Sequence, residues 1–421
     1  MSAFPRLLLR DPAIDLVELP WEAPLAEWKA ENLAFRELPV GPSRHLVRFL
    51  VVGRTLYALK ELPLAIGRRE YDVLLRLETA GLPAVIPAGI AEAPQRGTSI
   101  LATEYLPHSL QYRRLLMRLP PGPSVHRDRL LDAMAFLLVD LHRNGVYWGD
   151  CSLANTLFRR DGDRIQAYLV DAETSEIHPG LSDGQREYDI EILVENVAFG
   201  LADLAAMEDS ADHEEAIDAA ERVRDRYQAV WAELHDEPVL FAGDRQAMRS
   251  RVRRLNDLGY SVDLAIDPTH GDDRVRLRMN VTTRRFHSRE IERRTRIRAL
   301  EGQAQLLLND LNEYHAWLEW QSGHQITPDD AAERWLREVY RPTLATIAGT
   351  VGPDRDLIQA YCDVLEQKWY LSEAAGFDVG LELAIEAYLY LGAPAPESAG
   401  AGGSSVALDL ERLGDEDADR N

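Results

Sequence analysis

The stretch Leu141-His-Arg-Asn-Gly-Val-Tyr-Trp-Gly-Asp-Cys-Ser-Leu-Ala-Asn-Thr-Leu-Phe158 joins a helix pattern to a short strand pattern in this chain of 421 residues. The helix pattern covers residues 126–143, where apolar side chains recur on one face. Asp150 is followed five residues later by Asn155, and sixteen residues further an apolar run ends at Asp171. Polar side chains that follow buried elements are typical of a functional loop.

These three side chains have the chemistry that phosphoryl transfer needs. The reaction requires a carboxylate near the acceptor hydroxyl and oxygen ligands for the magnesium on the β- and γ-phosphates. Asp150 is predicted to be that carboxylate, acting as the base or the orienting group. Asn155 and Asp171 are predicted to be the metal ligands.

Upstream, the sequence predicts a β-hairpin and a helix that add a lysine and a glutamate. Two apolar runs flank a Gly53-Arg54 turn, and helical spacing follows over residues 66–80. Ala58 and Lys60 share one face of the second strand, so a flat base has room while the lysine reaches phosphate oxygens. Glu70 is placed to hold Lys60 as an ion pair. A solvated lysine and a surface helix charge are the alternatives.

Taken in order, these motifs resemble the protein-kinase superfamily, in its lipopolysaccharide-kinase and aminoglycoside-phosphotransferase-like branch, over about residues 45–205. The similar segments are Ala58-Leu-Lys60 for the V-A-I-K strand, Glu70 for its helix partner, Ile100-Leu-Ala-Thr-Glu-Tyr-Leu106 for the hinge, Trp148-Gly-Asp150 with Asn155 for the catalytic loop, Val170-Asp-Ala-Glu173 for the metal loop, and Glu187-Tyr-Asp189 for the helix whose aspartate braces that loop. The resemblance implies ATP and Mg²⁺ as cofactors. It implies catalytic roles for Asp150, Lys60 and Glu70, and a nucleotide site at Ala58, Lys60, Glu104 and Leu106.

Three departures from the family pattern bear on the activity. No G-x-G-x-x-G loop precedes the first strand, where Val40-Gly-Pro-Ser43 is the only small-residue turn. Trp148 stands where the family usually has histidine. Gly149 replaces the arginine that reads a phosphorylated activation loop in regulated protein kinases. This glycine is typical of the small-molecule branch, so the expected acceptor is a small molecule, sugar or glycolipid.

The predicted fold class is α+β, with a two-lobed kinase-like domain followed by a mostly helical domain that contains a β-hairpin. The second half resembles an uncharacterised domain found fused to such kinases in bacteria. The expected divisions are a lead-in at 1–45, a kinase-like domain at 46–235 (N-lobe 46–107, C-lobe 108–235), an α-rich domain at 240–392 and a disordered acidic tail at 393–421. Helical stretches are expected at 189–234, 287–320, 328–348, 353–375 and 378–391.

Composition narrows the class of protein. The net charge of −23 argues against nucleic acid as a partner. Two cysteines, Cys151 and Cys362, exclude a disulfide framework and favour a reducing compartment. Neither a signal peptide nor an apolar run of membrane-spanning length is found, so a cytoplasmic location is expected.

Arginine is concentrated in the second half. Residues 245–298 hold 15 Arg, no Lys and seven acidic residues, a net charge of +8. Arg274, Arg276 and Arg278 alternate along one predicted strand. These arginines either pair with the acidic kinase-like half or form a site for an anionic ligand, such as a phosphorylated molecule that bridges the domains. Trp317, Trp320, Trp335 and Trp369 are expected to be core residues.

Two functions are compatible with these patterns. The first is an ATP- and magnesium-dependent phosphotransferase that acts on a hydroxyl group, which the intact Lys60, Asp150, Asn155 and Asp171 favour. The second is a pseudokinase that binds nucleotide and acts as a regulatory or scaffold protein, which the missing glycine loop favours. The acceptor and the oligomeric state are not encoded in any motif.

Overall fold

The structure is a computed structural model of the whole chain. It describes residues 5–38, 44–116, 125–207, 213–235, 240–241, 245–267, 276–353 and 355–394. The turn at Val40-Gly-Pro-Ser43, Arg274 and most of the acidic tail lie outside these ranges. Within the described residues, no helix combines the length and the apolar character that a membrane span requires.

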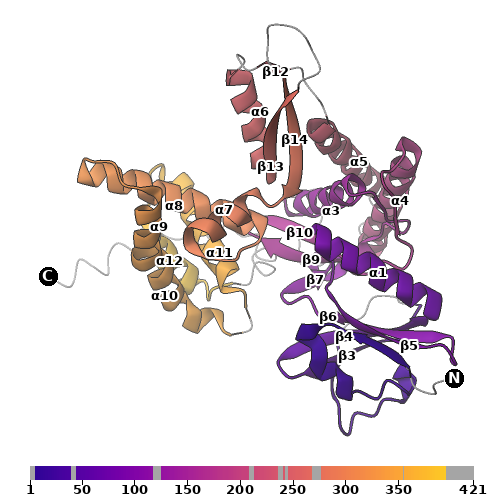
Figure 1. Cartoon of the computed structure of the whole chain (residues 1–421). Coiled ribbons are helices and arrows are strands. Elements are labelled where there is room, and N and C mark those ends of the chain that lie inside the picture. The colour runs from indigo at the N-terminus through magenta and orange to yellow at the C-terminus, as the bar shows by residue number, and fades with distance from the viewer. Residues whose placement is uncertain are drawn as a thin grey trace.

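The N-terminal lobe is built on a six-stranded antiparallel sheet (Figure 1). Its strand order is β1 (Arg6–Leu9), β5 (Pro87–Ala93), β6 (Thr98–Glu104), β4 (Thr55–Pro63), β3 (Val47–Val52) and β2 (Ala34–Arg36). The predicted hairpin is confirmed, and Gly53, at φ 61°, makes its turn. Helix α1 (Leu64–Ala80) follows β4 and ends where Gly81 adopts the left-handed conformation, as its sequence predicts.

The two faces of β4 serve different purposes. Successive side chains of a strand point to opposite faces. Tyr57 and Leu59 therefore enter one apolar cluster, while Leu62 packs with α1 in the other. Ala58 and Lys60 share the α1 face, where the cleft between the lobes opens. The alternation of the strand thus separates the residues of the site from those of the outer layer.

Residues 6–36 are more ordered than the expected irregular lead-in. They supply β1 and β2, and the 3-10 helices η1 (Asp11–Glu18) and η2 (Leu25–Glu27). Their apolar side chains cover the outer face of the sheet, with Trp21 and Trp28 packed edge to face. The many prolines favour 3-10 turns and extended chain over a regular helix pattern, which is why periodicity alone missed this layer.

The C-terminal lobe is mainly helical. Its helices are α2 (Tyr112–Leu116), α3 (Val125–Arg143), α4 (Asp183–Met207) and α5 (His213–His235). Its strands are β7 (Ser109–Gln111), β8 (Val146–Tyr147), β9 (Thr156–Asp161), β10 (Arg164–Leu169) and β11 (Glu176–Ile177), with the 3-10 turn η3 (Leu153–Asn155) before β9. The helical stretch expected at 189–234 is two helices, α4 and α5, that pack against each other and begin earlier, at Asp183.

The second half begins with a small sheet and ends in a bundle of helices (Figure 1). The sheet contains β12 (Leu240–Phe241), β14 (Arg276–Arg284) and β13 (Tyr260–Asp267), beside α6 (Arg245–Asp257). The helices are α7 (Phe286–Thr295), α8 (Glu301–Ser322), α9 (Pro328–Trp335), a π-helical turn (Leu336–Tyr340), α10 (Arg341–Val351), α11 (Leu357–Ala375) and α12 (Gly380–Tyr390). The β13–β14 hairpin is confirmed, but the helix expected at 287–320 is broken at Arg296, whose φ is 65°.

The apolar contacts cross the expected boundary near residue 240. Leu255 and Tyr260, from α6 and β13, belong to the same buried cluster as α3 and α1. The helices after Phe286 have clusters of their own, centred on Trp335 and on Ile347. The hairpin is therefore packed as a part of the kinase-like half.

The expectation that four tryptophans lie in the core is wrong for three of them. Trp335 is fully buried and donates its indole N–H to Asp310. Trp317, Trp320 and Trp369 are exposed, Trp320 to 81%. Helical spacing correctly predicted that all four tryptophans lie in helices. It does not predict which face of each helix is covered by other elements of the fold.

The turn between β9 and β10 fixes the C-terminal helices to the kinase-like half. Gly162 exchanges two hydrogen bonds of 2.9 Å with the side chain of Gln359 in α11. Asp161 accepts the backbone N–H of Gln303, at the start of α8, at 2.8 Å. Arg160 pairs with Glu366 at 2.9 Å. This junction of backbone and charged groups makes the two halves one unit.

Gly162→Ala is expected to loosen this junction. Gly162 has φ +65°, and an added Cβ would lie 2.8 Å from the backbone of Gly302. The backbone strain and the clash together cost on the order of 3 kcal/mol. Chemical denaturation and limited proteolysis between α7 and α8 measure the effect. Gly97→Ala is the matched control, because Gly97 has φ +67° and nothing within 4 Å of the added Cβ; equal losses in both variants would contradict the role of the contact.

Candidate functional site

A cleft of about 460 Å³ separates the N-terminal sheet from the loops of the C-terminal lobe. All eight residues proposed from the sequence line it, namely Ala58, Lys60, Glu70, Glu104, Leu106, Asp150, Asn155 and Asp171. They come from β4, α1, the end of β6, the loop after β8, η3 and the residues after β10. Segments more than 100 residues apart in the chain thus meet at one site.

Lys60 lies at the centre of a group of carboxylates. Its Nζ is 2.7 Å from Asp171 Oδ2, 3.3 Å from Glu70 Oε2 and 3.7 Å from Glu173 Oε2. Burial lowers the pKa of the Lys60 amine, but Glu70 and Asp171 more than compensate, and the net pKa is raised. Lys60 is therefore a fixed cation.

Glu70 is held in a dry position on α1. Its side chain is 1% exposed, and its Oε1 accepts the backbone N–H of Ala172. Burial raises the pKa of Glu70 from 4.5 to about 7, although Lys60 opposes that shift. The contact to Ala172 joins α1 to the segment that carries Asp171.

This pKa predicts a pH dependence that Glu70→Gln removes. Because the folded protein holds the proton of Glu70 more tightly than the unfolded chain does, its contribution to stability decreases as the pH rises from about 4.5 to about 7. Melting temperatures of the nucleotide-free protein between these pH values should therefore fall more steeply for the wild type than for Glu70→Gln. Parallel profiles would show that Glu70 titrates as it does in water.

Hydrogen bonds to Asp189 hold the loop that carries Asp150 in place. This buried carboxylate, in α4, accepts the backbone N–H groups of Trp148 at 2.7 Å and Gly149 at 2.8 Å. Its Oδ2 is also 3.1 Å from Nε2 of His142. Burial lowers the pKa of His142, so the neutral ring donates to Asp189 and accepts from Tyr227 at Nδ1. Trp148 is fully buried in the position where the family usually has histidine.

Asn155 positions Asp150. Its Nδ2 donates to Asp150 Oδ2 at 3.0 Å and to the Asp150 carbonyl at 3.3 Å. Ser152 caps η3 by accepting the backbone N–H of Asn155. With Nδ2 engaged, Oδ1 of Asn155 remains available as a ligand.

The sequence patterns assigned no role to two further residues of the cleft. Glu173 contacts Lys60, and its Oε2 is buried without a hydrogen bond. His45 Nε2 lies 3.2 Å from the same oxygen. The spacing of Asp171 and Glu173 was the available signal for Glu173, whereas His45 comes from a part of the chain without a motif.

The carboxylates around Lys60 could hold a magnesium ion. Three carboxylates, Glu70, Asp171 and Glu173, surround one lysine, so the group is short of positive charge. Among the described residues, no three His, Cys, Asp or Glu side chains form a metal site by themselves. Magnesium usually takes only one or two protein carboxylates and completes its ligands with water and substrate phosphates. Asp171 and the Oδ1 of Asn155 match that pattern.

The fold and this arrangement define a two-lobed kinase-like domain. Residues 49–209 match the model of the Lipopolysaccharide kinase (Kdo/WaaP) family, and residues 229–391 match that of a Domain of unknown function (DUF4032). The chain is therefore a kinase-like domain similar to that family, fused to an uncharacterised domain, as the resemblance implied. No curated protein matches the chain. Among solved structures, "WaaP in complex with acyl carrier protein" has a TM-score of 0.34 and 23% identity, and the match covers 53% of this chain and 99% of that one.

Proposed function

We propose that residues 46–235 bind ATP with Mg²⁺ and transfer the γ-phosphate to a hydroxyl group of a small molecule, sugar or glycolipid. The observation that carries the proposal is the contact of Lys60 with Asp171 at 2.7 Å and Glu70 at 3.3 Å, in the cleft that Asp150 and Asn155 also line. The match to a lipopolysaccharide kinase family supports a sugar or glycolipid acceptor.

The residues divide into those that hold the nucleotide and those that act on the acceptor. Ala58 leaves space for the base on the face of β4 that Lys60 shares. The backbone N–H of Glu104 is already bonded to Ile86, while that of Leu106 has no partner among the described residues, so Leu106 is the donor for the base. Lys60, fixed by Glu70, binds phosphate oxygens.

Asp150 acts on the acceptor. When bound, ATP supplies the transferable phosphoryl group and Mg²⁺ neutralises its negative charge. Held by Asn155, the Asp150 carboxylate orients the acceptor hydroxyl and accepts its proton at the free oxygen Oδ1. Arg44 and Arg114 line the same cleft and are available for a negatively charged acceptor.

Thermal-shift titration with ATP and Mg²⁺ tests the nucleotide site. The wild type is expected to gain several degrees at saturating nucleotide, because a ligand that binds only the folded state stabilises it. Lys60→Met should lose most of that gain. Lys368→Met is the control, since Lys368 lies in α11 and contacts Glu313 and Asp378. A lack of any shift with the wild type would contradict the proposal.

Transfer to an acceptor panel separates the enzyme from a pseudokinase. The phosphotransferase predicts label from γ-labelled ATP on a sugar or glycolipid. Nucleotide binding without transfer to any hydroxyl, water included, would instead favour the pseudokinase.

A further inference from the structure

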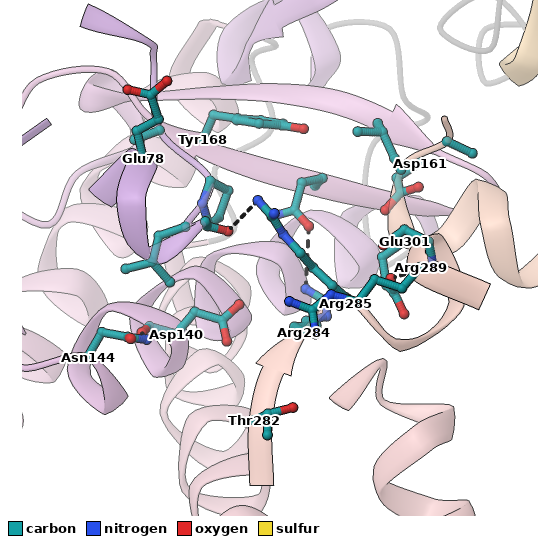
Figure 2. A pocket seen from close by; sticks show the side chains of 18 of the residues that line it. Glu78, Asp140, Asn144, Asp161, Tyr168, Thr282, Arg284, Arg285, Arg289 and Glu301 are labelled. Atoms are coloured by element: carbon teal, nitrogen blue, oxygen red, sulfur yellow. Dashed lines mark hydrogen bonds between the residues drawn. The ribbon is translucent and has the colours of Figure 1, made fainter. Parts of the chain in front are cut away.

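A second cavity, of about 770 Å³, lies at the junction of the two halves and shares no lining residue with the cleft. One side is formed by the end of α1, residues 82–86, the end of α3 and the β9–β10 hairpin. The other side is formed by the end of β14, α7 and the start of α8. Figure 2 shows Arg284 and Arg285 reaching into the cavity opposite Tyr168. Its size is that of a small-molecule site.

Of its five arginines, three are held by other groups, Arg298 by an ion pair with Glu292, and two are available. Arg284 bonds Leu258 and Gln166 and stacks on Phe136, and Arg143 donates to the carbonyls of Val281 and Thr282. Arg285 makes one hydrogen bond, to the carbonyl of Gly81. Arg289, in the first turn of α7, has no side-chain hydrogen bond or ion pair among the described residues. Arg285 and Arg289 therefore line the cavity without an ion-pair partner.

The acidic residues of the cavity form no ion pair with these two arginines. Each has another partner: Glu78 pairs with Arg10, Asp140 accepts from Tyr260, Asp161 accepts from Gln303, Glu292 pairs with Arg298, and Glu301 accepts from His287 and Ser288. Arg285 and Arg289 therefore keep guanidinium N–H groups that can donate to a ligand. Two guanidinium groups match a doubly charged phosphate in charge and in hydrogen-bond geometry.

The opposite wall suits an organic group. Leu82, Pro83, Ala84 and Ile86 line it, together with the ring of Tyr168. The Tyr168 hydroxyl has no hydrogen-bond partner among the described residues, so it can bond a ligand hydroxyl. We infer that this junction cavity binds a phosphate monoester of a small organic molecule, with Arg285 and Arg289 on the phosphate and Tyr168 on the organic part.

Residues 82–86 lie between the cavity and the nucleotide cleft, and through them a ligand in the cavity affects nucleotide binding. This coupling rests on the proposed function. This segment is a wall shared by both pockets, because Ala84 and Ile86 line the cavity while Val85 lines the cleft. The N–H of Val85 bonds Leu169, two residues before Asp171, at 3.0 Å. The carbonyl of Ile86 accepts the N–H of Glu104 at 2.8 Å. We expect a ligand on one face of the wall to shift these two hydrogen bonds and so to change nucleotide affinity on the other face.

Calorimetric titration of the full-length chain with glucose 6-phosphate, glycerol 3-phosphate and phosphoserine tests the site. At least one of them should bind saturably to the wild type, and its Kd should rise about tenfold or more in Arg285→Ala and Arg289→Ala, the loss expected for a charge-assisted hydrogen bond. Arg293→Ala is the matched control, because Arg293 lies on α7, pairs with Glu290 and does not line the cavity.

The outcomes separate this inference from the proposed function. Asp171→Ala should leave phosphate-monoester binding unchanged, since Asp171 lies in the cleft. Absence of saturable binding of all three compounds below about 10 mM, or equal loss in Arg289→Ala and Arg293→Ala, would overturn the site. If inorganic phosphate bound as tightly as the monoesters, the claim that the site recognises the organic part of the ligand would be wrong. The Kd of ATP should change when the best monoester is present; an unchanged Kd would overturn the regulatory role.

Discussion

Asp171→Ala is expected to remove most of the magnesium-dependent nucleotide binding while the protein stays folded. Asp171 follows β10 at the edge of the cleft and is partly exposed, so the core does not depend on it. Lys60 keeps its contacts with Glu70 and Glu173 in the variant. Loss of a metal carboxylate should raise the Kd of ATP with Mg²⁺ by about a hundredfold, which corresponds to about 3 kcal/mol.

The matched change, Asp150→Ala, should give the opposite result. Asp150 faces the acceptor, so ATP affinity should stay within about threefold of the wild type while transfer falls by roughly 10² to 10⁴. Calorimetry for ATP and a phosphoryl-transfer assay measure the two quantities separately. Equal losses of ATP affinity in both variants would contradict this division of roles.

Asp189→Ala should cause the largest loss of stability. The buried carboxylate accepts from Trp148, Gly149 and His142, and its removal leaves two buried donors and one partly buried donor without a partner. Each such group costs about 1–3 kcal/mol, so the expected loss is on the order of 3–5 kcal/mol. Chemical denaturation measures it. Because the same bonds fix the loop before Asp150, transfer activity should also fall at temperatures where the variant is still folded.

Asp183→Ala is the control for this prediction. Asp183 begins the same helix, but its side chain is almost fully exposed and only pairs with Arg186. An exposed ion pair contributes about 0–1 kcal/mol. A comparable loss in both variants would mean that α4, rather than the bonds of Asp189, is responsible for the effect.

The arginine-rich segment shows that a charge pattern does not predict the partner of each arginine. One alternative drawn from the sequence, pairing with the kinase-like half, is observed for two of the arginines, while the anionic ligand stays a proposal. Arg251 and Arg254 pair with Glu233 of the kinase-like half, whereas Arg285 and Arg289 face the junction cavity. The backbone of Arg276 and Arg278 lies in β14, opposite Asp267 and Ala265, and the ligand proposed for the stripe that they form with Arg274 stays a prediction. The net charge of a segment determines the average electrostatic potential around it. It does not determine which group each charged side chain contacts.

The candidate site was accessible from sequence because its chemistry depends on short spacings. A strand places Ala58 and Lys60 on one face, and a tight loop keeps Asp150 and Asn155 within hydrogen-bond distance, at 3.0 Å. Glu173 and His45 were missed because their role follows from the position of Lys60, which is 113 residues from Glu173 in the chain. The same limit applied to Trp317 and Trp320, which are exposed on faces of α8 that no described element covers.

Local sequence patterns were sufficient to predict the hairpin, the helix after it, the helix before the Asp150 loop and the order of the site residues, because these depend on periodicity and turn chemistry over short segments. Three features follow from the folded chain alone: residues 6–36 cover the sheet, the β9–β10 turn contacts the C-terminal helices, and Arg285 and Arg289 line the same cavity as Ala84 and Ile86. Such contacts join segments far apart in the chain. Their free energy comes from burial and from hydrogen bonds that exist only once the chain has folded.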